Sequence, residues 1–362
     1  MALLNTILLC PECKKRGTRE HYPWRCECGE PFILSGEAHI QFDDIKNLPK
    51  NFWRFRDVLP IKEVPPELTG LGGWTDLTPV EIDNRTIYVK QDYQLPSGSF
   101  KDRGASVMAA HVKETGISEV VEDTSGNAGV ALSYYAGKLG ITCHIYSTTT
   151  INPIKEKKII ENGAVLHKVS ADRQAVTDET LRQVQEKYYA SHTYNPYFLH
   201  GTKSIAYEIF EQFNYRVPDA VIVPVGNGTL ILGLDLGFRE LKLMDYCTTI
   251  PKLVGVQAAA RCPIVSHYDN SISPADGEKN IAEGIDVACP PRIRQILRAV
   301  KESEGKMLAV SNAEIMAEES LRDRLGANIE WTSLTAVAGA RKYVKEIREK
   351  EIVVVPLTGA NC

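Results

Sequence analysis

A single lysine stands in a turn of small residues at Leu95–Gly104, which reads LPSGSFKDRG. Lys101 is flanked by Ser99, Asp102 and Arg103 and directly precedes an apolar run. A lysine amine forms a Schiff base with a carbonyl compound when its surroundings desolvate it and hold it in place. An ordinary surface charge near a helix start would give the same local sequence, so a chemical role for Lys101 depends on its partners.

A first partner is the Ser125-Gly126-Asn127 turn in the stretch VEDTSGNAGVA. It follows an apolar run and precedes a helical pattern, so it is predicted at a helix N-terminus. Backbone N–H groups there point outward and favour an anion such as a substrate carboxylate. A simple helix N-cap would explain the same residue types, because Ser, Thr and Asn all cap helices.

A second partner is the glycine-rich turn in VPVGNGTLILG. Gly226 and Gly228 allow backbone amides to close around a phosphate, Asn227 lies between them, and Thr229 adds a hydroxyl donor. No Gly-Lys-Ser/Thr follows, so the turn is not a Walker motif. The position of Gly233 does not fit the dinucleotide fingerprint either. A tight strand-to-helix turn is the alternative interpretation.

A third partner is Thr358, which the run IVVVPLTG would place at the tip of a strand. Its hydroxyl could bond a ring nitrogen, although turn threonines are common. Together, a lysine amine, a glycine turn for one phosphate, an asparagine and a terminal hydroxyl suit a phosphorylated aldehyde that carries an aromatic nitrogen. This description matches pyridoxal phosphate, and the combination is far more specific than any single member.

The elements that must hold these turns follow a strand–helix rhythm from about residue 86 onward. Continuous apolar, β-branched runs such as AVIVPVG and IVVVPLTG are typical of strands buried on both faces of a parallel sheet. We therefore predict an α/β protein with open, twisted parallel sheets in two lobes. Ligands of such sheets bind beyond the carboxyl ends of the strands, where the three turns lie. Residues 43–80 are predicted to wrap over this body as an extended segment.

The N-terminal region contains four clustered cysteines, Cys10, Cys13, Cys26 and Cys28. Four thiolates at this spacing could hold a structural zinc ion, although the Cys-x-Cys knuckle is tighter than usual. A remnant ribbon without metal is the alternative. In either case we expect a structural role, because a closed four-cysteine site leaves no open position for catalysis.

Composition excludes several classes of protein. The 362 residues are 43% hydrophobic and 24% charged, with a net charge of −4, so no nucleic-acid or membrane partner is indicated. There is no apolar run long enough for a membrane span. The nine cysteines do not form a secreted disulfide pattern, and no signal peptide is expected. We therefore expect a cytoplasmic protein.

The chain resembles the fold-type II pyridoxal-phosphate enzymes, and among them threonine synthase and its relatives. The cysteines at the N-terminus also look like the leader of some threonine synthases. The matching motifs occur in the family's order: GSFKDRG (98–104), TSGNAG (124–129), NPYFLHGTKSIAYEI (195–209), PVGNGTLILG (224–233), IAEGI (281–285) and PLTG (356–359).

The resemblance implies a role for each matching position. Lys101 would carry the cofactor as a Schiff base and then move protons as acid and base. Asn127 would hydrogen-bond the ring hydroxyl, and Thr358 would meet the pyridine nitrogen. The other implied sites are the cofactor-phosphate cradle of Gly226, Asn227, Gly228 and Thr229, and the substrate-carboxylate turn of Thr124, Ser125 and Gly126.

The resemblance also implies a domain layout and an assembly. Residues 1–36 would form a zinc-ribbon-like leader, residues 37–92 and 200–362 a large cofactor-binding domain, and residues 93–199 a small domain that closes on substrate. A homodimer that acts on a small amino acid is expected.

One departure concerns the substrate. Where the family pattern has an arginine for the phosphate of O-phosphohomoserine, this chain has Phe198, which cannot form a charge-assisted fork. Either the pocket accepts a different leaving group, or it binds phosphate through Lys155, His192 and Thr193. For Lys155, a solvated helix lysine is an equally good interpretation.

The predicted function is conversion of O-phosphohomoserine and water to threonine and phosphate. A second hypothesis is β-elimination or β-replacement on a hydroxy or O-phospho amino acid, as in a threonine/serine dehydratase or a cysteate-synthase-like enzyme. A third is a non-catalytic scaffold whose ribbon binds a partner. The presence of Lys101, Asn127 and Thr358 argues against the scaffold.

Overall fold

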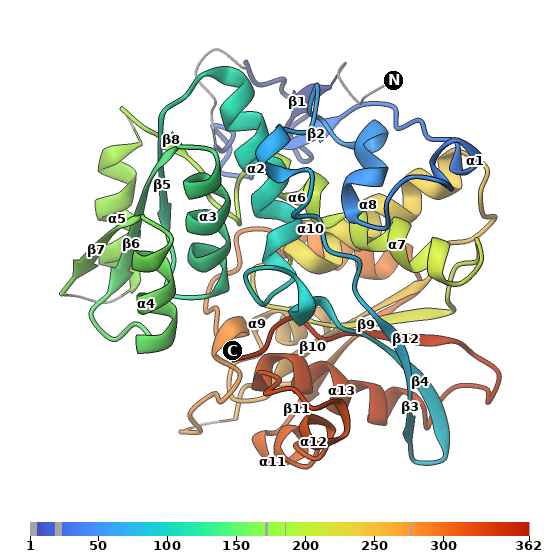
Figure 1. Cartoon of the computed structure of the whole chain (residues 1–362). Helices are drawn as coiled ribbons and strands as arrows, with labels where there is room; N and C mark the ends of the chain where they lie inside the picture. Colours follow the sequence, from blue (N-terminus) through green and yellow to red (C-terminus); the bar gives the residue numbers. More distant parts are fainter. Residues whose placement is uncertain (1–5, 19–23, 171–172, 185, 276, 362) are drawn as a thin grey trace. The chain divides into compact units, whose positions relative to one another are not determined.

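The protein divides into two compact units, Met1–Gly73 with Lys101–Ser204 and Trp74–Phe100 with Ile205–Cys362. Its structure is a computed structural model, drawn in Figure 1. It describes residues 6–18, 24–170, 173–184, 186–275 and 277–361.

The first unit combines an N-terminal two-stranded ribbon with a four-stranded parallel sheet of order β7-β6-β5-β8. Helices α3 and α5 lie on opposite sides of β6 (Figure 1). Connections between parallel strands are right-handed. Helices therefore fall on opposite faces of a sheet when strands are added first on one side of the starting strand and then on the other. The elements are β1 (Ile7–Leu9), β2 (Ile33–Ser35), α1 (Phe42–Ile45), η1 (Phe52–Val58), η2 (Pro66–Leu68), α2 (Lys101–Thr115), β5 (Glu119–Asp123), α3 (Asn127–Lys138), β6 (Thr142–Thr148), α4 (Pro153–Glu161), β7 (Val165–Val169), α5 (Arg173–Gln183), β8 (Tyr188–Tyr189) and α6 (Pro196–Thr202).

The second unit is built on a six-stranded sheet of order β11-β10-β9-β12-β4-β3. Its pairs are parallel except for the β3–β4 hairpin at one edge. The elements are β3 (Leu77–Ile82), β4 (Arg85–Lys90), η3 (Asp92–Gln94), α7 (Ser204–Gln212), β9 (Ala220–Pro224), α8 (Thr229–Leu243), β10 (Lys252–Ala258), α9 (Pro263–Tyr268), η4 (Glu283–Ile285), α10 (Ile293–Glu302), β11 (Lys306–Val310), α11 (Asn312–Met316), α12 (Leu321–Leu325), α13 (Trp331–Tyr343) and β12 (Val353–Pro356).

The predicted α/β class with parallel sheets is confirmed, and the central strands are buried on both faces. Every residue of β9 and of β12 is buried, as expected for apolar strands covered by helices. The antiparallel β3–β4 hairpin was not predicted from the sequence. Its turn is Asp83-Asn84, with φ values of 50° and 59°, and Asn and Asp tolerate this left-handed region better than most residues.

The segment expected to be an extended wrap contains regular structure, and that part of the prediction is wrong. The 3₁₀ helix η1 buries Phe52, Trp53 and Phe55. The backbone N–H groups of Lys62 and Glu63 donate to Glu114 Oε1 at 2.6 and 3.2 Å. These contacts explain why residues up to Gly73 belong to the first compact unit. The functional division into a large and a small domain stays a prediction.

Among the helices of the described residues, none has the length and apolar character needed to cross a membrane.

Candidate active site

Lys101 is the first residue of α2, and the turn before it is fixed to the chain after β12. The Phe100 N–H donates to the carbonyl oxygen of Thr358 at 3.0 Å, and Ser99 forms an antiparallel bridge with Gly359. The Ala360 N–H donates to the carbonyl oxygen of Gly98 at 3.2 Å. These three contacts lie within the second unit and fix the turn of residues 98–100, which directly precedes Lys101 in the chain, to the segment that follows β12.

Thr358 is 3% exposed, and its hydroxyl lies 3.1 Å from the hydroxyl of Ser333 in the first turn of α13. The Gly359 N–H donates to Ser333 Oγ at 3.2 Å. A serine 25 positions earlier therefore orients the predicted ring-nitrogen partner. Sequence reasoning missed Ser333, since no local motif marks so distant a contact.

The glycine-rich turn joins β9 to α8 as predicted. Gly228 is the N-cap of α8 and has a φ of +85°, a region that L side chains rarely adopt. Gly226, Gly228 and Thr229 are buried and Asn227 is half-buried. A glycine cap offers no side-chain oxygen to the first N–H groups of the helix, so these groups suit an anion.

The glycine-rich turn and the Thr358 region belong to one packed framework in the second unit. A Cβ at Gly226 would lie 3.0 Å from the Cα of Ile285 in η4. The N–H of Gly284, also in η4, donates to Thr332 Oγ1 at 3.1 Å. Thr332 is the neighbour of Ser333, so η4 and the start of α13 connect the predicted phosphate cradle with the predicted ring-nitrogen partner.

In the first unit, the Thr124–Asn127 turn lies between β5 and α3. Gly126 is the N-cap of α3 in extended geometry and offers no side-chain cap hydrogen bond. Thr124 is buried, and its Oγ1 accepts the Gly126 N–H at 3.2 Å. Ser125 is exposed and Asn127 half-buried. As at the start of α8, the helix begins at a glycine N-cap without a side-chain cap hydrogen bond, so its first N–H groups are suited to a carboxylate.

Phe198 lies beside Lys101 in the same unit. The Lys101 Nζ is 5.7 Å from the centroid of the Phe198 ring, and Phe198 is 1% exposed. A Cβ added to Gly104 would come within 2.4 Å of two ring carbons of Phe198. The Phe198 ring therefore leaves no room for a side chain at position 104. The side chain next to Lys101 is aromatic at the position where the family pattern has an arginine.

His192 is oriented by a buried carboxylate. Its Nδ1 lies 2.5 Å from Glu122 Oε1, and its backbone N–H donates to the same oxygen at 2.8 Å. The ring meets Phe198 edge-on at 6.1 Å. Thr193 is buried, and its N–H donates to Ser191 Oγ at 3.3 Å. Sequence reasoning missed Glu122, although an acid close to the end of an apolar strand signals a buried polar contact.

Lys155 lies in the first turn of α4, which begins at the Asn152 N-cap and packs against α3. Its side chain is half-buried. The phosphate-binding role of Lys155 stays a prediction.

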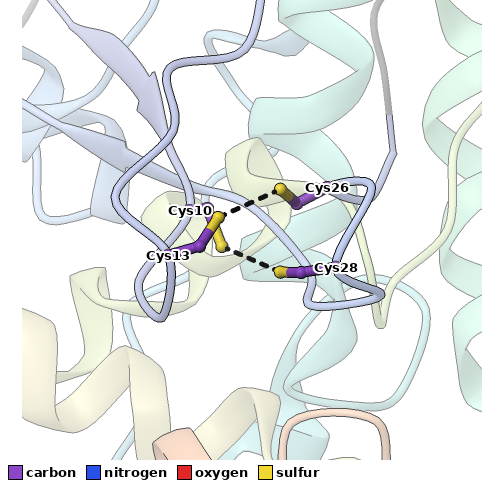
Figure 2. Close-up of side chains that lie close together, drawn as sticks. All are labelled: Cys10, Cys13, Cys26 and Cys28. Atoms are coloured by element: carbon purple, nitrogen blue, oxygen red, sulfur yellow. Dashed lines mark hydrogen bonds between the residues drawn. The ribbon is translucent and has the colours of Figure 1, made fainter.

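The four N-terminal cysteines converge. Their Sγ atoms all lie within 4.8 Å of one another (Figure 2), with Cys10–Cys28 and Cys13–Cys26 each at 3.5 Å. Around a tetrahedral zinc ion with bonds of about 2.3 Å, sulfur atoms lie about 3.8 Å apart. The cluster therefore fits a zinc ion.

The residues also fit pyridoxal phosphate by the chemistry of their donors. Two helices start at glycine caps, a buried hydroxyl pair lies at Thr358, and Lys101 directly follows the fixed turn. Ser99 Oγ, 1% exposed, has no hydrogen-bond partner among the described residues. A buried polar atom of this kind is costly unless a bound group satisfies it.

Comparison with known proteins supports the same conclusion. Residues 68–359 match the family described as pyridoxal-phosphate dependent enzyme. The chain is 31% identical to threonine synthase of Methanosarcina acetivorans and 30% identical to threonine synthase of Methanocaldococcus jannaschii. Each of these matches covers 97% of this chain and 91% of the relative.

Two solved structures share the fold. Processed threonine deaminase isoform 2 from Solanum lycopersicum has a TM-score of 0.71 at 20% identity and covers 95% of this chain and 92% of its own. Maize serine racemase has a TM-score of 0.68 at 18% identity and covers 82% and 91%. The family match favours an enzyme over a non-catalytic scaffold. The family model covers most of the chain and the relatives of about 30% identity are threonine synthases, so the chain belongs to the pyridoxal-phosphate dependent enzymes, among the threonine-synthase-like lyases.

Proposed function

We propose that the protein is a threonine synthase, which converts O-phosphohomoserine and water into threonine and phosphate. The observation that carries this proposal is the similarity, over 97% of the chain, to two proteins named threonine synthase. The chemistry of the predicted site residues supports it, because the chain combines a lysine at the start of α2, two helix starts with glycine caps that suit anions, and a buried hydroxyl at Thr358.

Pyridoxal phosphate, when bound through Lys101, supplies an electron sink that acidifies the substrate's Cα and then Cβ protons. The Lys101 amine takes the Cα proton and returns protons as the γ-phosphate leaves and water adds at Cβ. The Gly226–Thr229 turn would hold the cofactor phosphate through N–H groups at the start of α8. Thr358 would be the hydrogen-bond partner of the ring nitrogen, and a hydroxyl partner favours elimination and replacement over transamination.

The substrate would be held by the other helix start. N–H groups at Thr124–Asn127 would bind its carboxylate, and Asn127 would bond the ring hydroxyl of the cofactor. For the substrate phosphate we propose Lys155, His192 and Thr193. The bond from His192 to Glu122 fixes the ring, so its position is set before substrate arrives.

Phe198 favours a second candidate function. An aromatic ring beside Lys101 gives no charge-assisted hydrogen bond to a leaving phosphate. Of the alternatives, a threonine/serine dehydratase fits this position, because it has no leaving phosphate to bind. For a dehydratase, hydroxide rather than phosphate leaves from Cβ.

Product analysis separates the two candidates. The purified protein, loaded with pyridoxal phosphate, is incubated with O-phospho-L-homoserine, L-threonine and L-serine in parallel. We expect equimolar phosphate and threonine from O-phosphohomoserine and no keto acid from threonine. Keto acid from threonine or serine, with no phosphate released from O-phosphohomoserine, would overturn the synthase proposal. The Lys101→Ala variant is the blank for all three reactions.

We further propose that the four cysteines hold structural zinc and that the enzyme is a cytoplasmic homodimer. Metal analysis should find about one zinc per chain, lost in Cys26→Ala. Light scattering of the purified enzyme should give twice the chain mass of 40.2 kDa. A monomer mass, or a chain purified without zinc from zinc-supplemented medium, would contradict these assignments.

A further inference from the structure

The cysteine ribbon (residues 6–18 and 24–35) contacts the segment that carries the proposed phosphate-binding residues. Trp24, two positions before Cys26, packs edge-on against Tyr194 at 4.7 Å and against Tyr189 at 5.5 Å between ring centroids. The Arg25 guanidinium lies 4.3 Å from the Trp24 ring centroid. The indole is thus held between its own knuckle and two tyrosines of the first unit.

Those two tyrosines flank His192 and Thr193. Tyr189 ends β8, is 5% exposed, and donates its hydroxyl hydrogen to Asp123 at the end of β5. Tyr194 directly precedes Asn195, the N-cap of α6. Between them the chain turns, and the Asn195 N–H donates to the carbonyl oxygen of Ser191 at 2.9 Å. Trp24 therefore covers both ends of the turn that presents His192 and Thr193.

A second contact reaches the same segment from the other side of the ribbon. The His200 Nε2 lies 3.2 Å from the carbonyl oxygen of Leu34 in β2. His200 is 2% exposed and lies two residues after Phe198 on α6. The ribbon thus touches the Tyr189–His200 segment at its beginning, through Trp24, and at its end, through Leu34.

The four cysteines are divided between the two knuckles of the ribbon. Cys26 and Cys28 belong to the Trp24 knuckle, whereas Cys10 and Cys13 belong to the other knuckle. No disulfide joins the two knuckles. A metal ion is what binds knuckles of this kind together, because four thiols alone offer weak hydrogen bonds.

We propose that the metal-loaded ribbon braces the Tyr189–His200 segment, with Trp24 as a positioning residue that holds His192 and Thr193 ready for the substrate phosphate. The substrate part of this inference rests on the proposed function. The brace itself does not, because it concerns contacts within the first unit. When the metal is lost, the knuckle that carries Trp24 is no longer held to the other knuckle, and the Tyr189–His200 segment loses the packing of Trp24 on Tyr189 and Tyr194.

Hydrogen exchange of the zinc-loaded holoenzyme tests the brace without turnover. Removal of zinc with a chelator, or Trp24→Ala with zinc still bound, should speed exchange in peptides of residues 189–200. Peptides of α8 in the second unit should not change. Trp24→Phe keeps an aromatic ring and should restore most of the protection. Unchanged exchange at 189–200 in both the zinc-free protein and the Trp24→Ala variant would overturn the proposal.

Kinetics distinguish positioning from general stabilisation. With O-phosphohomoserine, Trp24→Ala should raise KM about tenfold or more and change kcat less than threefold, with bound zinc and cofactor absorption unchanged. Trp53→Phe is the matched control, since Trp53 is buried in the same unit beside Gly72 and should lower Tm without raising KM. An equal rise in KM in both variants would contradict the positioning role. If O-phosphohomoserine is not a substrate, the exchange result still decides the brace, and only the proposed function fails.

Discussion

The N–H of Phe100 donates a hydrogen bond to the carbonyl oxygen of Thr358, although 258 positions separate the two residues in the chain. Phe100 immediately precedes Lys101, and the Thr358 hydroxyl meets Ser333. The same residue that faces the ring nitrogen in the proposed function therefore also fixes the turn that delivers the lysine.

Gly228 should be essential for cofactor binding. Its φ of +85° disfavours any side chain, and a Cβ would lie 2.3 Å from the Cδ1 of buried Ile296. Gly228→Ala is expected to cost about 1–3 kcal/mol of stability and to weaken the affinity for pyridoxal phosphate at least tenfold. Titration of visible absorption with added cofactor measures this affinity.

Gly326→Ala is the matched control. Gly326 also has a positive φ, of 61°, but a Cβ there meets no atom within 4 Å. It should lose some stability and keep wild-type cofactor affinity. Equal affinities for the cofactor in the Gly228→Ala and wild-type proteins would remove the phosphate-cradle role from this turn.

The fit between Gly104 and Phe198 should appear as coupled stabilities. A Cβ at position 104 collides with the ring at 2.4 Å, so Gly104→Ala should destabilise the protein by about 1–3 kcal/mol. In the Phe198→Ala background the ring is absent, and the same change should cost much less. Urea unfolding of both singles and the double variant measures the coupling, and additive costs would show that the ring does not fill this space.

The strands and helix starts that carry the candidate residues were predictable, because each of them leaves a local signal in the sequence. The runs before Ser125, Gly226 and Thr358 predicted strands ending at those turns, and β5, β9 and β12 end there. Glycine and small polar residues predicted the helix starts at α3 and α8. Local patterns sufficed at these positions, since a buried parallel strand and a glycine cap each leave a sequence signal.

What the sequence did not predict depends on long-range contacts. Ser333 reaches Thr358 only because α13 packs beside β12, and Glu122 reaches His192 only because β8 pairs with β5. The two-residue strand β8 is too short to give a periodic signal. The extended interpretation of residues 43–80 failed because Pro- and Gly-rich sequence also permits 3₁₀ turns, whose apolar side chains pack on a larger body.

His200 should make stability depend on pH. Burial lowers its pKa well below the ordinary value of 6.5, with a smaller effect of nearby Lys203. In the unfolded chain it binds a proton near pH 6.5, so below that pH the unfolded state holds more protons. Stability should therefore fall as pH drops below 6.5, by up to about 1.4 kcal/mol per pH unit from this group.

Urea unfolding between pH 5 and 7.5 measures this slope. His200→Gln retains an N–H donor for the Leu34 carbonyl and should flatten the slope. His267→Gln, at an exposed ring, is the control and should leave it unchanged. A slope that is the same in His200→Gln and wild type would assign the pH dependence to other groups.

The most direct test of the account is to locate the cofactor on the chain. Borohydride reduction of the enzyme loaded with pyridoxal phosphate fixes the cofactor to the lysine that binds it, and peptide mass spectrometry then identifies that lysine among the chain's peptides. The account predicts a single modified residue, Lys101, with the label and the visible absorption both lost in Lys101→Ala. A label on any other lysine, or an unlabelled protein that still turns over substrate, would contradict it.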